Sequence, residues 1–189
     1  MRKYLMVLIV LQLRLLAFGQ ENMNTGILYG DNFAYSLTAP NGWVLDNESG
    51  VSQGLYAVFY KKGGSWKNSE VIMYTNTSSL LEASHKTIAQ LIKYDLDDFR
   101  NNYKDILISD GKDIVISDKL KAKVKYLSGK SYGNFEAVAY IDAGKTGVLI
   151  TMSSRTKKGF DSSLLAFESL VKSYFFMADK VTIKNTKKN

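Results

Sequence analysis

The sequence predicts an α+β fold, a mostly antiparallel β-sheet flanked by two main helices in an α/β/α sandwich. Three observations support this fold class. Short segments with period-two alternation dominate the chain, two long amphipathic stretches interrupt them, and strands and helices do not alternate regularly as they do in parallel α/β proteins. We divide the chain into a signal peptide (1–19), a polar lead-in (20–31), a single domain (32–176) and a basic flexible tail (177–189).

The first nineteen residues have the order of a secretory signal peptide. Arg2 and Lys3 precede an apolar run that ends at Phe18, and Gly19 closes a small-residue cleavage site. An uncleaved anchor stays open as the alternative because Arg14 weakens the run, although a membrane-spanning helix needs about 20 apolar residues. The leader predicts export to the periplasm or the medium, without stable membrane insertion after cleavage.

Turn residues mark the ends of the first predicted strands of the domain. Residues 33–38 alternate and end at the turn triplet Pro40-Asn41-Gly42, after which Trp43 is expected in the core. Residues 55–60 and 70–75 form two further strand patterns. The Gly63-Gly64 loop between them predicts a hairpin.

A long helix is expected next. Ser79 and Glu82 have the spacing of a capping box, and apolar residues then recur at three- and four-residue steps as far as about residue 102. These apolar positions are Leu81, Ile88, Leu91, Ile92, Leu96 and Phe99. The pattern predicts a helix that covers one face of the sheet.

The rest of the domain continues as a meander and closes with a helix. Strand patterns cover residues 106–108, 114–116, 121–126, 135–141 and 147–152. Helical spacing from about Asp161 to Phe175 predicts the second helix, with Asp161 as its cap.

The order of these elements, with the strand that leads into Pro40-Asn41-Gly42-Trp43, resembles the PsbP-like fold over residues 32–176. That family includes the extrinsic PsbP protein of photosystem II, a nuclear-transport regulator of the same fold and many exported bacterial proteins. The resemblance implies a binding or accessory module rather than an enzyme.

The net charge of +7 is concentrated at the two ends of the chain. The leader and the tail each contribute +3, so the body between them carries only +1. A nucleic-acid-binding domain concentrates basic residues on its folded surface. The sequence therefore predicts no nucleic-acid partner.

Residue types exclude most kinds of catalysis. The chain has no cysteine and a single histidine, which removes cysteine nucleophiles and zinc sites that need two or more of these ligands. The absence of disulfides in an exported protein is typical of a bacterial envelope or secreted protein. Gly129 to Gly133 spells Gly-x-Ser-x-Gly, but a strand follows where a nucleophile elbow needs a helix. We expect no enzyme, cofactor or metal.

Asp95 and His85 form a possible buried polar site on the long helix. Asp95 falls inside the apolar stripe, so its carboxylate is expected to have a hydrogen-bond partner in the sheet. His85 lies at the flank of the stripe, and we interpret it as a half-buried helix residue rather than a catalytic base.

Loop residues are the candidates for binding a partner. Trp66 follows Lys61 and Lys62 in a polar turn, and tryptophan with nearby lysines is typical of an interface anchor. A ring folded back against the hairpin is the open alternative. Tyr132 has a similar position in a second loop.

The sequence thus predicts an exported, non-enzymatic module that binds another protein or an envelope component near Trp66. A binder of a small ligand or glycan, with a tyrosine-lined cavity beside Asp95 or His85, is the alternative. A hydrolase would need a serine or a carboxylate pair placed in a cleft.

Overall fold

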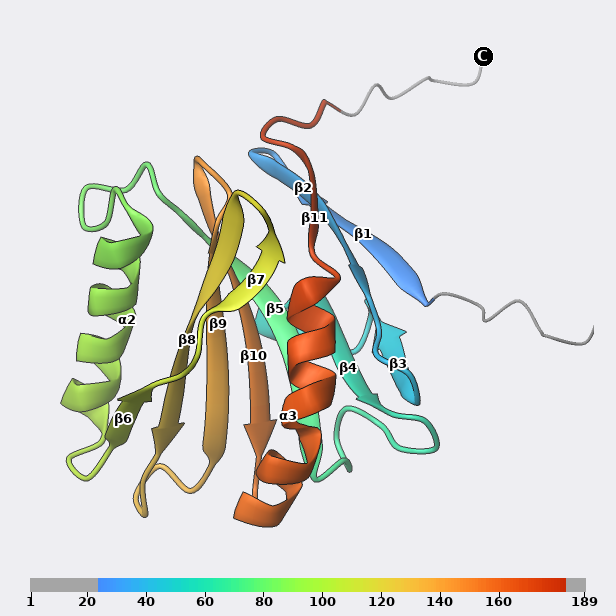
Figure 1. The fold of residues 1–189 in the computed structure, drawn as a ribbon, viewed down its shortest axis with the longest axis vertical. Coiled ribbons are helices and arrows are strands. Elements are labelled where there is room, and N and C mark those ends of the chain that lie inside the picture. The colour runs from blue at the N-terminus through green and yellow to red at the C-terminus, as the bar shows by residue number, and fades with distance from the viewer. Residues whose placement is uncertain (1–23, 183–189) are drawn as a thin grey trace, which may run out of the picture.

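The computed structural model describes residues 24–182, which form two α-helices and eleven β-strands (Figure 1). The strands are β1 (Thr25–Gly30), β2 (Phe33–Thr38), β3 (Trp43–Asp46), β4 (Ala57–Lys61), β5 (Val71–Ser79), β6 (Leu107–Asp110), β7 (Ile114–Ser117), β8 (Leu120–Ser128), β9 (Phe135–Asp142), β10 (Thr146–Ser154) and β11 (Phe175–Ala178). The helices are α2 (Ile88–Asn102) and α3 (Lys157–Lys172), and a 3-10 turn covers Val51–Gln53. The predicted signal peptide, 1–19, lies outside the described residues.

Eight strands form one large antiparallel sheet. Its order is β3-β4-β5-β10-β9-β8-β6, and β7 pairs with β8 beside β6. The hairpin across the Gly63-Gly64 loop is confirmed, because β4 and β5 pair antiparallel. The predicted meander is confirmed as well, since β8, β9 and β10 pair in succession.

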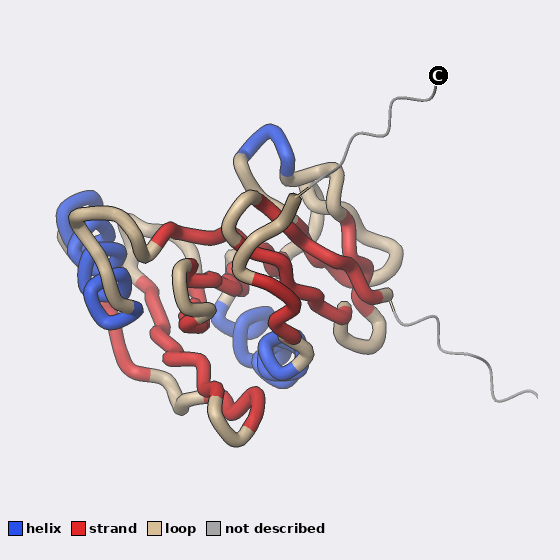
Figure 2. Tube along the Cα trace, turned by 90° about the horizontal axis from the view of Figure 1, so that it is seen from above, coloured by secondary structure: helices blue, strands red, loops and turns tan. Residues whose placement is uncertain are grey.

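The alternation of β9 shows how the layers are arranged. Ala137, Ala139 and Ile141 belong to the core under α3, whereas Val138 and Tyr140 belong to a second core under α2. Successive strand side chains point to opposite faces, so the two helices cover opposite faces of the sheet. Figure 2 shows the helices separated by strands. The predicted α/β/α sandwich is confirmed.

Neither α-helix within residues 24–182 has the length and apolar character needed to cross a bilayer.

A second, three-stranded sheet with the order β1-β2-β11 includes residues on both sides of the predicted domain, 32–176. The lead-in contains a strand, because Thr25–Gly30 pairs with β2 and buries Leu28 in the core. Gly26 lets β1 lie close to β3, since a β-carbon there would be 2.8 Å from Leu45 Cδ1. At the other end, β11 includes Met177 and Ala178, which were expected in the flexible tail. Pairing with β2 orders both segments, and a local pattern does not show such pairing.

The long helix begins later than predicted. Ser79 is the last residue of β5 and pairs with Thr146, so the strand continues through the expected cap. Thr87 caps α2 instead, and its side chain accepts a hydrogen bond from the backbone nitrogen of Gln90. Leu81, placed in the apolar stripe by the sequence, is 63% exposed in the connecting loop.

Replacement of Thr87 by alanine is expected to lower the free energy of unfolding by about 1 kcal/mol, because the α2 N-terminus loses its side-chain acceptor. Urea unfolding monitored by circular dichroism measures this change. Thr87→Ser keeps the acceptor and is the matched control. A larger loss for Ser79→Ala than for Thr87→Ala would show that the helix begins at the first cap after all.

The second helix, in contrast, begins before its predicted cap, Asp161. Thr156 caps α3 and accepts from the backbone nitrogen of Gly159 at 3.0 Å. Asp161 lies within the helix, where it pairs with Lys157. Gly159 permits the close approach of α3 to the sheet, because a β-carbon there would be 2.7 Å from Ser154 Oγ.

Candidate functional site

Trp66 lies in the loop between β4 and β5, on the side of the sheet that α2 covers. The indole is half-buried and packs edge-on against Tyr74 of β5, with ring centroids 6.0 Å apart. Of the two orientations left open by the sequence, the structure has the ring folded against the hairpin.

The two lysines before Trp66 do not form a cluster with it. Lys61 pairs across the sheet with Trp43 and places its ammonium 6.0 Å from the centroid of the Trp43 ring, on the α3 side. Trp43 itself is buried, as predicted. Lys62 is exposed in the turn, where its backbone nitrogen donates to Gly42 O.

Asp95 has the partner that the sequence predicted. The Tyr140 hydroxyl of β9 donates a hydrogen bond to the Asp95 carboxylate. Burial raises the pKa of Asp95, while the Tyr140 hydrogen bond opposes that shift and Asp98 adds to it. Tyr140 has a raised pKa as well, through burial and the adjacent Asp95 charge.

Glu136 lies on the same face of β9, two residues along the strand from Val138. Burial raises the pKa of Glu136, and the hydroxyls of Tyr132 and Ser153 oppose the shift. Tyr132 lies in the loop between β8 and β9 and packs against Phe99 of α2 with ring centroids 5.7 Å apart. Its pKa is raised by burial and by the nearby Glu136 charge.

Tyr74 connects this group to Trp66. Burial raises the Tyr74 pKa, the Glu136 and Asp95 charges raise it further, and the Thr151 hydroxyl lowers it. We call the set Tyr74, Asp95, Tyr132, Glu136 and Tyr140 the tyrosine–carboxylate cluster. The structure therefore brings Asp95 and Tyr132 together, with Trp66 at one side.

Sequence reasoning missed three members of the cluster. Tyr74 and Tyr140 looked like ordinary strand residues. Glu136 carried a usable signal, because it is the one charged residue between Phe135 and Ile141 and its position in a buried strand requires hydrogen-bond partners.

His85 is buried in the loop before α2, not on the helix as predicted. Its two ring nitrogens lie 2.9 Å from the hydroxyls of Ser78 and Ser84, and its ring centroid is 5.2 Å from that of Tyr94. The delayed helix start accounts for the difference. Both nitrogens have partners, so His85 serves to hold the loop against β5.

Ser131, in the Gly-x-Ser-x-Gly segment, lies in the turn between β8 and β9. Its hydroxyl donates to Asp105 rather than facing a histidine base. Within residues 24–182, no group of three or more potential metal ligands is arranged to hold an ion. Within the tyrosine–carboxylate cluster, Tyr140 donates a hydrogen bond to Asp95, and burial raises the pKa of both carboxyl groups.

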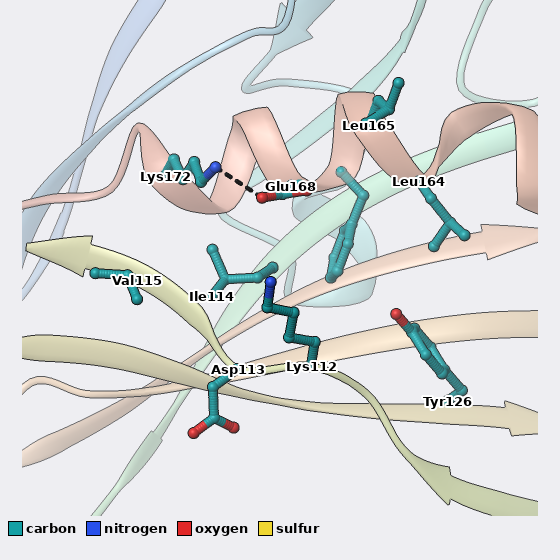
Figure 3. Close-up of a pocket in the computed structure, with 10 residues that line it drawn as sticks. Lys112, Asp113, Ile114, Val115, Tyr126, Leu164, Leu165, Glu168 and Lys172 are labelled. Carbon is teal, nitrogen blue, oxygen red and sulfur yellow. Dashed lines mark ion pairs between the residues drawn. The ribbon is translucent and has the colours of Figure 1, made fainter.

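A separate cavity of about 280 Å³ lies between β7 and α3 (Figure 3). Ile114 and Leu164 are among its apolar residues. Glu168 and Lys172 form an ion pair of 2.7 Å along its helical side, as the dashed line in Figure 3 marks. The volume is just below the lower end of the range for typical ligand sites.

The fold is shared with proteins of known structure. The sequence matches no model of a known protein family, and a search of curated proteins finds no relative. The structure is similar to cyanobacterial PsbP (CyanoP) from Synechocystis sp. PCC 6803, with 13% identity and a TM-score of 0.51, over 85% of this chain and 96% of that one. It is also similar to the Ran-binding protein Mog1p of Saccharomyces cerevisiae, with 10% identity and a TM-score of 0.50, over 82% of this chain and 96% of that one. The chain therefore has the PsbP-like fold that its order of elements predicted.

Proposed function

We propose that this chain is an exported, non-catalytic module that binds another protein through the α2-side face of its large sheet, next to Trp66. The observation that carries the proposal is a group of partly exposed aromatic residues on β4 and β5. These strands lie past the part of the sheet that packs against α2. The α2 core reaches Leu127, Val138 and Leu149, whereas Tyr60 and Tyr74 of β4 and β5 stay partly exposed. Aromatic side chains in such positions are typical anchors of protein interfaces.

The cluster supports this face by fixing its shape. The Tyr74 ring packs edge-on against Trp66, and the charges of Glu136 and Asp95 raise the pKa of its hydroxyl. A ring held in place before association loses little conformational entropy on binding. Mog1p, which has this fold, is a Ran-binding protein, and this fact favours a protein partner over catalysis for the present chain.

The alternative of a small-ligand or glycan binder has less support. Cavities of about 280, 380 and 230 Å³ lie among residues 24–182, and none of these three is lined by Asp95 or His85. Both side chains are engaged with protein hydroxyls.

Trp66→Ala is expected to weaken binding of the partner about 30-fold or more, as for an aromatic residue at the centre of an interface. The partner is captured from envelope and secreted fractions with the tagged chain, and its affinity for each variant is measured by calorimetry. Intact mass of the captured chain also shows whether cleavage follows Gly19.

Leu165→Ala removes an 82% exposed apolar side chain from α3 and is the control, because that residue lies on the opposite side of the large sheet. Unchanged affinity of a folded Trp66→Ala variant would refute the site. Loss of affinity in both variants would point to a nonspecific effect of surface hydrophobicity.

A further inference from the structure

A small apolar core holds α2 on the large sheet. The fully buried residues of this helix are Leu91 and Leu96, and seven buried residues in all form the core beneath it. The core between α3 and the sheets contains 23 buried residues. Elements with few buried apolar contacts open at a lower free energy than the whole domain does. We therefore expect α2, which lies toward the β6 edge of the large sheet (Figure 1), to separate from the sheet more readily than α3.

Two links join α2 to β9, and a carboxyl group belongs to each. Asp95 reaches from the helix to the Tyr140 hydroxyl of the strand. Glu136 of β9 is 4% exposed, and the Tyr132 hydroxyl lowers its pKa. The Tyr132 ring in turn packs against Phe99 of the helix. Protonation of either carboxyl group therefore changes a contact that positions α2.

No cation compensates the two carboxyl groups within residues 24–182, because neither of them forms an ion pair there. Lys123 and Lys125 lie on the same face of β8 as Leu127, which belongs to the α2 core. These lysines pair instead with Asp113 and Asp110. A buried carboxylate without a cation is costly in free energy when it is ionised.

The other ionisable groups near the two carboxyl groups are acids or tyrosines. They are Asp98 of α2, Tyr74 of β5, Tyr140 of β9, Tyr132 of the β8–β9 loop and Tyr103 after α2. Burial raises the pKa of Asp95 and of Glu136, and the Asp95 charge raises that of Glu136 further. In water the two groups ionise near their ordinary pKa values of 3.8 and 4.5. Their contribution to a closed α2 is thus present at acid pH and is lost as pH rises through the raised values.

We propose that α2 is a pH-sensitive cover of the large sheet, which stays closed when Asp95 and Glu136 are protonated and opens locally when both are ionised. The core around α3 and the small sheet stay folded during this opening. Leu127, Val138 and Leu149, which the closed helix covers, then become accessible. The device involves contacts within this chain alone, so it does not rest on the protein-binding proposal.

The test is hydrogen exchange of the whole chain, followed by mass spectrometry of its peptides and corrected for the intrinsic dependence of exchange on pH. Amides of α2 should be at least about tenfold less protected than those of α3. Their protection should also fall about tenfold or more between about pH 4 and about pH 7.5. Global unfolding exposes the same carboxyl groups, so α3 shares this trend, and the lower protection of α2 at each pH identifies a local opening.

The Asp95→Asn/Glu136→Gln variant keeps polar side chains at both positions but removes both ionisable groups, so the fall in α2 protection should disappear. Each single variant should keep part of the fall, which provides the result if the double variant does not fold. Asp97→Asn is the matched control on the same helix. It removes a carboxylate that pairs with Lys93 and Arg100 on the helix surface, and the fall should remain.

Three results would overturn the proposal. Equal protection of α2 and α3 at both pH values would show that the helix opens only with the whole domain. Protection of α2 that does not change with pH, or a fall that persists in the double variant, would show that the two carboxyl groups do not control it. Trp66→Ala should exchange as the unaltered chain does, so this test and that of the protein-binding site can fail separately.

Discussion

Phe167→Ala is expected to lower the free energy of unfolding by about 3–5 kcal/mol, the largest effect of any single substitution considered for this chain. Phe167 is 2% exposed and belongs to the core between α3 and the sheets. Alanine loses most of the apolar side-chain surface that folding removes from water. It also leaves a cavity that the rigid strands cannot fill. A domain of this kind has only about 5–15 kcal/mol of total stability.

Urea unfolding of Phe167→Ala and Leu165→Ala provides the measurement. Leu165 lies two residues away on the same helix but is 82% exposed, so its truncation should change stability by less than about 0.5 kcal/mol. Phe167→Leu keeps most of the volume and should lose markedly less than the alanine variant, which keeps the comparison usable if alanine prevents folding. Similar losses at positions 165 and 167 would contradict the placement of α3.

Tyr140→Phe is expected to cost about 1–3 kcal/mol at neutral pH, because the buried Asp95 carboxylate loses its hydroxyl donor. The cost should depend on pH. Burial already raises the pKa of Asp95 above its ordinary value of 3.8, and removal of the Tyr140 hydrogen bond raises it further.

The sign of this dependence follows from proton binding. A raised carboxyl pKa means that the folded chain holds its proton at a pH where the unfolded chain has released it, so stability falls as pH rises from about 4 through the folded-state pKa. The cost of Tyr140→Phe should therefore be smallest at acid pH and grow towards neutral pH.

Stability curves from about pH 3.5 to 8 test this prediction with a double-mutant cycle. Asp95→Asn keeps an acceptor for Tyr140 but removes the ionisable group, so it should flatten the part of the profile due to Asp95. Glu136 also has a raised pKa, and the Asp95 charge is one of the causes, so Asp95→Asn should reduce the Glu136 part of the slope as well. A cost of Tyr140→Phe that is constant with pH, or unchanged in the Asp95→Asn background, would contradict the assigned hydrogen bond.

The candidate site shows how far local sequence reasoning extends. The position of Asp95 in an apolar stripe required a partner, and the structure confirms one. The identity of that partner was out of reach, because Tyr140 lies 45 residues away and meets α2 only through the order of strands in the sheet. The same holds for Tyr74, which is next to Trp66 through packing and not through any pattern along the chain.

The helix start shows two local signals in competition. Ser79 with Glu82 and Thr87 with its following apolar positions both satisfy the rules for a cap. Pairing of β5 with β10 keeps Ser79 in a strand, so the helix begins at Ile88. Sequence alone cannot rank the two, because the deciding hydrogen bonds come from residues 145 and 146.

Local periodicity and composition are sufficient for the α+β class, the hairpins, both helices and the argument against thiol or zinc chemistry, because each depends on neighbours along the chain or on residue types. Long-range pairing decides the rest. It adds β1 and β11 to β2 as a separate sheet, turns Lys61 away from Trp66 and joins two carboxyl groups with three tyrosines on one face. Such contacts join segments far apart in sequence, and their energies depend on which strands become neighbours in the folded chain.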